Sequence, residues 1–147
     1  MRRMLVLSIL LMLAIFLAAC GQADQAGGDE GAGTPEAIKV GAIYPVTGAL
    51  AATGTDLTNG VKLAVEIVNG EFPDLNLPLA AEAGLPNLGG AKVEIVWGDH
   101  QGSAEKGMSE AERLITQEKV VALLGCYNSA VTATASQVAE RNGIPFL

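Results

Sequence analysis

Residues 120–143 constrain the fold of this 147-residue chain more than any other stretch. The segment Val-Val-Ala-Leu-Leu at 120–124 is apolar at every position, which is typical of a strand covered on both faces of a sheet. Gly125 permits a sharp turn, and residues 130–140 then predict a helix that ends near Gly143. A buried strand followed by a tight turn and a helix is the repeating unit of α/β domains, and we expect that fold class here.

The start of this helix is the first candidate site. Asn128 and Ser129 are of the residue types that cap helices, and they follow the carboxyl end of the predicted strand. Ligands of open α/β sheets bind at such strand ends, and the free amides at a helix start favour a carboxylate or a phosphate. Two roles for Ser129 stay open from these residues. It caps its own helix, which is the more ordinary role, or its hydroxyl contacts a ligand.

The rest of the chain repeats the alternation of strand and helix. Three more strands are predicted, over residues 37–44, 92–97 and 144–147. Two more helices are predicted, over about 57–68 and 103–118. This pattern predicts a doubly wound α/β domain with a parallel sheet. The glycine- and threonine-rich loop over 46–56 and residues 127–129 should then face one crevice at the carboxyl edge of the sheet.

Two segments depart from this regular pattern. Residues 71–91 contain Pro73, Pro78 and Pro86 and predict an irregular surface excursion, which we interpret as an insertion rather than as a functional loop. The chain stops at Leu147 inside an apolar segment, without a cap or a polar tail. We therefore expect the sequence to be a fragment of a longer protein.

The first 37 residues predict export and anchoring. Residues 1–4 are basic, and residues 5–19 are apolar except for Ser8; as a helix they would span roughly 22 Å, short of the roughly 30 Å hydrocarbon core. Residues 1–19 therefore predict a signal peptide, and Leu-Ala-Ala-Cys at 17–20 resembles a bacterial lipobox whose Cys20 is lipidated. Residues 20–37 predict a flexible tether. We expect the folded part, 38–147, to be extracytoplasmic and attached to the bacterial cell membrane through this lipid.

Composition and spacing argue against several functions. Sixteen acidic residues against nine lysines and arginines give a net charge of −7, which disfavours binding to nucleic acid. The single histidine, His100, and the two cysteines form no metal-binding cluster, and no glycine-rich nucleotide motif is present, so no metal or cofactor is expected. We interpret Cys126 as a small buried residue, and Asp99 with His100 as a solvated turn rather than an acid–base pair. No catalytic residue is assigned.

Several motifs, in this order and spacing, resemble those of a known family. They are the lipobox, Ile-Lys-Val-Gly-Ala-Ile-Tyr-Pro-Val-Thr-Gly at 38–48, Asn59-Gly60, Gly98-Asp99, Gly-Cys-Tyr-Asn-Ser-Ala-Val-Thr at 125–132, and Ala-Glu-Arg-Asn-Gly-Ile-Pro-Phe-Leu at 139–147. The set is similar to the branched-chain amino acid (Leu/Ile/Val) type of periplasmic substrate-binding protein, which has the type I periplasmic-binding-protein fold. The resemblance covers nearly all of residues 38–147 except 71–91.

This resemblance implies binding without catalysis. Proteins of this family close two α/β lobes over a small ligand and deliver it to an ABC permease, and this chain would supply most of the first lobe. The residue that holds the ligand α-carboxylate matches Ser129, and a pocket-wall position matches Thr53. Asn128 and Tyr127 would lie beside Ser129 in the same crevice. The ligand is expected to be an amino acid, with aliphatic ones favoured, or a related amide.

The resemblance also implies an absence and leaves two alternatives open. Some family members have a disulfide whose positions match Gln101 and Asn128, so that bond is missing here. The first alternative is a ligand-sensing module of a receptor with the same fold. The second is a doubly wound α/β enzyme, for which the sequence offers no activated nucleophile.

Overall fold

The computed structural model describes residues 37–147, so the predicted signal peptide, Cys20 and nearly all of the predicted tether lie outside the described residues. The described part has the predicted alternation of strands and helices: β1 (Ala37–Tyr44), α2 (Ala51–Asn69), β2 (Lys92–Asp99), α3 (Ala104–Thr116), β3 (Ala122–Gly125) and α4 (Ser129–Arg141). Three short 3-10 helices join them: η1 (Gly48–Leu50), η2 (Pro73–Leu75) and η3 (Pro86–Leu88). Within 37–147, no helix is long and apolar enough to cross a membrane.

The three strands form one parallel sheet in the order β2-β1-β3, which confirms the predicted parallel pairing. At the carboxyl end of the central strand, Tyr44 lies beside Asp99 of β2, and Ile43 lies beside Gly125 of β3. The turns that follow the three strands therefore leave from one edge of the sheet, as expected for an open α/β sheet.

The predicted fourth strand is present only as a start. Phe146 forms a single parallel bridge with Leu123 of β3. The Leu123 amide donates to the Pro145 oxygen (2.8 Å), and the Leu147 amide donates back to the Leu123 oxygen (2.9 Å). Residues 145–147 thus extend the sheet beyond β3.

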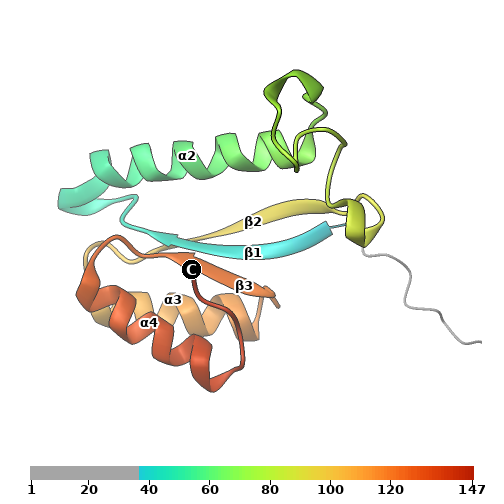
Figure 1. The fold of residues 1–147 in the computed structure, drawn as a ribbon. Helices are drawn as coiled ribbons and strands as arrows, with labels where there is room; N and C mark the ends of the chain where they lie inside the picture. The colour runs from blue at the N-terminus through green and yellow to red at the C-terminus, as the bar shows by residue number, and fades with distance from the viewer. Residues whose placement is uncertain (1–36) are drawn as a thin grey trace, which may run out of the picture. The chain divides into compact units, whose positions relative to one another are not determined.

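Helices cover both faces of the sheet, which confirms the doubly wound arrangement. Helix α2 packs against one face, and α3 and α4 pack side by side on the other (Figure 1). The apolar core lies on the α3–α4 side and includes Ile43, Ala111, Leu114, Ile115, Val120, Leu123, Cys126, Val131, Ala135, Val138 and Ala139. At Gly107, α3 and α4 approach so closely that an added Cβ would lie 2.2 Å from Cγ1 of Val131.

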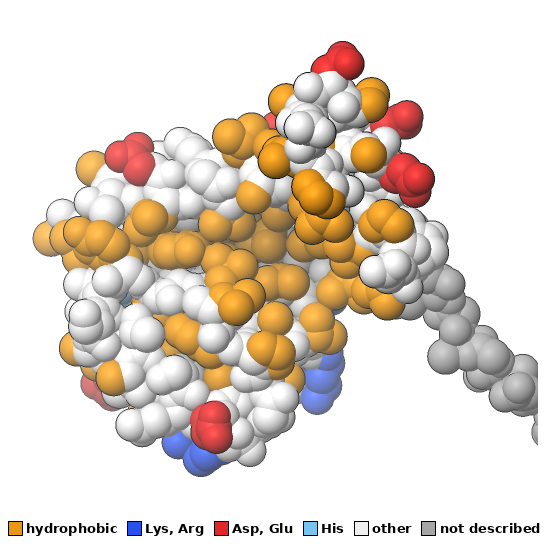
Figure 2. Space-filling model, viewed as in Figure 1, with side chains coloured by type: hydrophobic (Ala, Val, Ile, Leu, Met, Phe, Trp, Pro, Cys, Tyr) orange, Lys and Arg blue, Asp and Glu red, His pale blue; other side chains and the backbone are white. Residues whose placement is uncertain are grey.

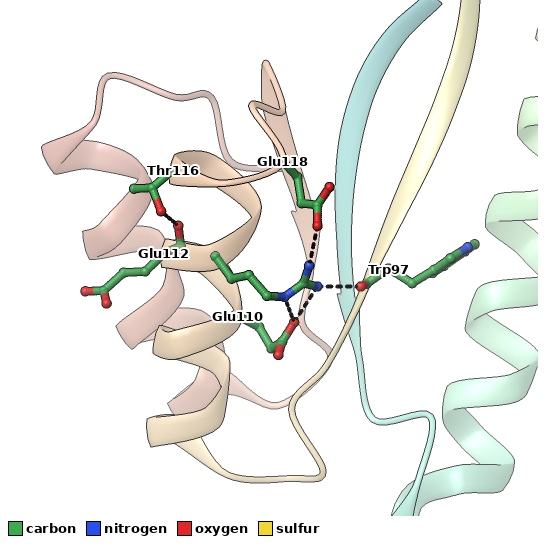
Figure 3. Close-up of polar contacts among 6 residues, drawn as sticks. Trp97, Glu110, Glu112, Thr116 and Glu118 are labelled. Atoms are coloured by element: carbon green, nitrogen blue, oxygen red, sulfur yellow. Dashed lines mark hydrogen bonds and ion pairs between the residues drawn. The ribbon is translucent and has the colours of Figure 1, made fainter.

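Arg113 attaches α3 to β2. Its guanidinium donates to Oε2 of Glu110 (2.7 Å), to Oε1 of Glu118 (3.0 Å) and to the main-chain oxygen of Trp97 (2.8 Å). Figure 3 shows these two carboxylates and the Trp97 oxygen meeting between the helix and the strand. Charge-assisted hydrogen bonds in a fixed fork geometry are stronger than neutral ones, so this group sets the position of α3 on the sheet.

Residues 71–91, called here the 71–91 loop, join the end of α2 to the start of β2. The loop therefore lies at the amino edge of the sheet, opposite the edge where the candidate site was predicted (Figure 1). Asn69 anchors its beginning, because the Asn69 side chain donates to the Val93 oxygen (2.8 Å) and accepts from the Val93 amide (2.7 Å). The loop is irregular apart from η2 and η3 and is mostly exposed, as predicted.

Several predicted boundaries are wrong, among them the start of β3, at Ala122 instead of residue 120, and the end of α3, at Thr116 instead of residue 118. Helix α2 begins at Ala51, preceded by η1, whereas a loop was predicted through residue 56. Gly54 explains the early start: a Cβ there would lie 2.1 Å from the Pro45 oxygen, so only glycine lets the first turn pack on the end of β1. Strand β2 also continues to Asp99, two residues beyond the prediction.

Candidate functional site

The carboxyl edge of the sheet is held together by two side chains at the end of β2, Asp99 as its last residue and His100 as the next residue. The first is Asp99. Its Oδ1 accepts from the amides of Val46 (3.1 Å) and Gln101 (3.1 Å), and its Oδ2 accepts from the Thr47 hydroxyl. Asp99 therefore joins the β1–α2 loop to the β2–α3 turn.

The hydrogen bonds to Asp99 favour its charged form. Burial alone would raise the pKa of the carboxyl, but the hydrogen bonds from Thr47, Gln101 and Val46 outweigh that effect and lower the pKa below its ordinary value. The carboxylate thus serves as an acceptor that fixes two loops, and it is unsuited to act as a general acid near neutral pH.

Replacing Asp99 with asparagine should lower the free energy of unfolding by about 1–2 kcal/mol at pH 7, because the charge-assisted bonds are lost. The pKa of the Asp99 carboxyl is lower in the folded protein than in the unfolded chain. The stabilisation is therefore fully present above the pKa of the unfolded chain and is lost as the pH falls through the pKa of the folded protein. The difference between wild type and variant, followed by urea unfolding, should therefore shrink below about pH 4. Asp56→Asn, an exposed change on α2, is the control. A difference that stays constant down to pH 2 would contradict this assignment.

The second side chain is His100. The prediction that His100 lies in a solvated turn is wrong. His100 is fully buried. Its Nε2 lies 2.8 Å from the Cys126 oxygen, and its Nδ1 accepts from the Gly102 amide (2.9 Å). These partners fix the tautomer that carries its proton on Nε2. His100 therefore joins the β2–α3 turn to the β3–α4 turn, and no acid–base role follows.

Cys126 fits the prediction of a small buried residue. The thiol is fully buried and belongs to the core. Burial raises the pKa of the Cys126 thiol to about 11, so the thiolate is scarce near neutral pH. This thiol is therefore a poor nucleophile.

The start of α4 offers free hydrogen-bond donors. Asn128 is the N-cap residue and Ser129 is the first helical residue, and the amide bonds to the Asn128 oxygen begin only at Val131 (3.0 Å). Among residues 37–147, no partner is found for the amides of Ser129 and Ala130 or for the exposed Ser129 hydroxyl. The ordinary role, in which Ser129 caps its own helix, is thus not what the structure shows. These donors are suited to a carboxylate.

Asn128 and Tyr127 lie beside these donors. The Asn128 side chain makes no capping bond, and its Oδ1 is buried without a hydrogen-bond partner in the described part of the chain. A buried acceptor of this kind calls for a donor. Tyr127 has a φ of +84°, a left-handed conformation that costs a non-glycine residue about 1–3 kcal/mol, and its side chain is exposed.

The fourth predicted residue, Thr53, lies in the first turn of α2 rather than in a loop, and it is half-buried. No hydrogen bond joins it to the turn at 127–129 within the described residues. The structure therefore brings Tyr127, Asn128 and Ser129 together, and it leaves Thr53 on the neighbouring element of the same edge.

Sequence reasoning missed the roles of Asp99 and His100. Their sequence position provided part of the signal, because both residues follow a predicted strand at the edge where the loops meet. Their partners in the other turns lie 52–53 residues away for Asp99 and 26 residues away for His100, so no local pattern identifies those contacts.

Taken together, these features define a doubly wound α/β lobe that presents a free helix start at its carboxyl edge. Residues 37–147 match the periplasmic binding protein family, and the chain belongs to that family.

Known relatives agree with this assignment. The chain is 34% identical over 109 residues to a Leu/Ile/Val-binding protein homolog of Brucella abortus, covering 74% of this chain and 24% of that protein. The branched-chain amino acid transporter substrate-binding protein of Streptococcus pneumoniae, solved with isoleucine, aligns with a TM-score of 0.59 and 29% identity, over 75% of this chain and 28% of the other. A solute-binding protein of an ABC transporter from R. palustris, solved with benzoate, aligns with a TM-score of 0.58 and 27% identity, over 75% and 26%.

These structures confirm the type I periplasmic-binding-protein fold expected from the sequence. The chain spans about a quarter of the length of the relatives it matches. It corresponds to part of one lobe.

Proposed function

We propose that this chain forms one wall of the ligand cleft of an extracytoplasmic solute-binding protein that serves an ABC importer. The ligand is a small molecule, namely an amino acid, with aliphatic ones favoured, or a related amide. The protein binds and releases this ligand without chemistry and passes it to a permease. Lipid on Cys20 holds it to the bacterial cell membrane.

One observation carries the proposal: the start of α4 presents free amides and the exposed Ser129 hydroxyl at the carboxyl edge of the sheet. An anion placed there would accept from Ser129 and Ala130 and would also lie at the positive end of the helix dipole. Isoleucine and benzoate, the ligands of two similar proteins, share only a carboxylate group. A carboxylate group fits the free donors at the start of α4.

The buried Oδ1 of Asn128 supports an amino acid over a simple acid. It lacks a donor in the described structure, and an ammonium group one carbon from the carboxylate would supply one. A carboxylic acid without an amine would leave this acceptor unsatisfied, as it is in the free protein, and would not gain that hydrogen bond. The unidentified side chain of the ligand would then face the exposed Tyr127 ring.

The Ser129 hydroxyl is the group to test. Ser129→Ala removes one hydrogen bond to a charged group, worth about 1.5–3 kcal/mol, so isoleucine should bind about 10- to 100-fold more weakly. Ser129→Asp should abolish measurable binding, because it sets a like charge against the ligand. Chemical shifts of the backbone amides during titration of the whole chain report the affinity, which we expect to be weak because the described residues form one wall of a cleft.

Ser136→Ala is the matched control, since Ser136 lies on the same helix and, within residues 37–147, its hydroxyl bonds only the Ala133 oxygen (3.3 Å). It should bind isoleucine like the wild type. Equal affinity of the wild type and both Ser129 variants for leucine, isoleucine, valine and benzoate would refute the proposed site. Chemical-shift changes confined to residues away from 127–132 would refute it equally.

A further inference from the structure

Strand β2 borders the sheet, because β1 is the only strand that pairs with it among residues 37–147. The backbone groups of successive residues in a strand point alternately to its two sides. The His100 amide still bonds toward β1, since it donates to the Tyr44 oxygen (3.3 Å). By alternation, the amides and oxygens of Val93, Ile95 and Trp97 point away from β1. These groups are called here the outer side of β2.

Side chains of the same chain hold both ends of the outer side. At the amino end, the Asn69 side chain donates to the Val93 oxygen (2.8 Å) and accepts from the Val93 amide (2.7 Å). At the carboxyl end, the Arg113 guanidinium donates to the Trp97 oxygen (2.8 Å; Figure 3). Asn69 belongs to α2 and Arg113 to α3, so these two caps reach the strand from opposite faces of the sheet.

The opposite border of the sheet is arranged differently. There, residues 145–147 bond to the amide and the oxygen of Leu123 on β3. Figure 2 shows this side of the molecule, where hydrophobic side chains gather between α2 and the helices of the other face. The backbone of β3 thus accepts a further extended segment, whereas side chains occupy the backbone of β2.

The charges of β2 do not prevent a second β2 strand from pairing along the outer side. In antiparallel pairing centred on Ile95, Lys92 lies opposite Gly98 and Glu94 lies opposite Val96. No like charges meet in this register. Lys92 itself donates to the main-chain oxygen of Asn69 (2.6 Å). Charge repulsion, a common protection of border strands, is therefore absent from this pairing.

The two caps, in contrast, remove hydrogen bonds that such pairing needs. Opposite residues of antiparallel strands exchange both of their backbone bonds, so Val93 would pair with the incoming Trp97, and Trp97 with the incoming Val93. Asn69 already holds both groups of Val93, and Arg113 holds the oxygen of Trp97. Only the Trp97 amide and the two groups of Ile95 would remain. Isolated pairs of strands are marginal in water even when complete.

We propose that Asn69 and Arg113 block the addition of a strand from another molecule, above all β2 of a second copy, to the outer side of β2. The two side chains confine the growth of the sheet to its β3 border. This role is independent of the proposed ligand site, whose residues lie in the turn between β3 and α4.

The test uses the whole chain and a fluorescein-labelled peptide with the sequence of residues 92–99, with binding followed by fluorescence anisotropy. Asn69→Ala combined with Arg113→Ala should bind the peptide at least about 10-fold more tightly than the wild type, because the bonds at both ends become available. Asn59→Ala combined with Arg141→Ala is the matched control. Both of these side chains are exposed, and Arg141 makes only a 3.9 Å contact with Glu112 within the described residues. The control should bind like the wild type.

A third change separates blocking from a loss of stability, since removing the caps also loosens α2 and α3. Ile95→Pro deletes the central amide of the outer side, and proline is tolerated on a border strand where its nitrogen points outward. Added to Asn69→Ala and Arg113→Ala, it should abolish peptide binding although it stabilises nothing. In the variant without the caps, bound peptide should also slow hydrogen exchange of the Trp97 amide.

Three outcomes would overturn the proposal. The first is peptide binding by the wild type that equals binding by the variant without the caps. The second is binding by that variant that survives Ile95→Pro, which would place the peptide elsewhere. The third is unchanged affinity in a variant whose amide spectrum shows that it is folded. If the double variant does not fold, Asn69→Ala alone frees both groups of Val93 and should give a smaller gain. Isoleucine binding reports separately on the ligand site.

Discussion

Gly125→Ala is expected to lower the free energy of unfolding by about 3–5 kcal/mol, enough to unfold many small domains. Gly125 ends β3 with a φ of +133°, a conformation that L side chains rarely adopt. A Cβ at this position would lie 2.2 Å from the Ile43 oxygen of the central strand. The oxygen belongs to the backbone and cannot move aside alone, so the strand pairing itself must shift.

Urea unfolding followed by the fluorescence of Trp97, the single tryptophan of the chain, measures this effect. Gly60→Ala is the matched control, because nothing lies within 4 Å of a Cβ built at Gly60 in the middle of α2. That control should stabilise the protein by roughly 0.5–1 kcal/mol through helix propensity. If both glycine variants unfold at the wild-type urea concentration, the close approach of β3 to β1 is not as described.

The second large effect is expected at His100. His100→Leu keeps the volume but leaves the Cys126 oxygen and the Gly102 amide buried without partners, so we expect a loss of about 3 kcal/mol. The β3–α4 turn should also loosen, which amide hydrogen exchange at residues 126–129 would detect as faster exchange.

Two conservative variants separate the two bonds of His100. His100→Gln can still reach the Cys126 oxygen with its amide nitrogen, and His100→Asn can still accept from the Gly102 amide. Each should recover roughly half of the stability lost in His100→Leu, since one of two comparable bonds returns. Faster exchange at residues 126–129 should persist in His100→Asn and be reduced in His100→Gln. Equal exchange in all three variants would show that His100 does not hold this turn.

The order of strands and helices was predictable because apolar periodicity is a local property. Residues 120–124 are apolar at every position and residues 37–44 are mostly apolar, which indicates buried strands, and β3 and β1 lie in the sheet at these places. The start of α2 was not predictable in the same way. Residues 51–56 contain glycine and threonine, which indicate a loop, yet Gly54 is in the helix because of what it packs against.

The candidate site was predictable only in its exposed half. The turn at 127–129 follows a strand end and opens a helix, and both features are visible in sequence. The supporting half is formed by Asp99 and His100 through partners distant in sequence, and a short polar segment between a strand and a helix is typical of a solvated turn. Burial of His100 depends on contacts with α3, at Gly107, and with Cys126, which no local pattern encodes.

Asp99 and His100 together make the three turns of the carboxyl edge a single unit before any ligand arrives. The conformational entropy of those turns is lost during folding, so association with a ligand should involve little further ordering on this side of the cleft. If the proposed ligand binds at this edge, the lobe should meet it as a rigid body, and a slow step in capture is expected in movements outside this edge.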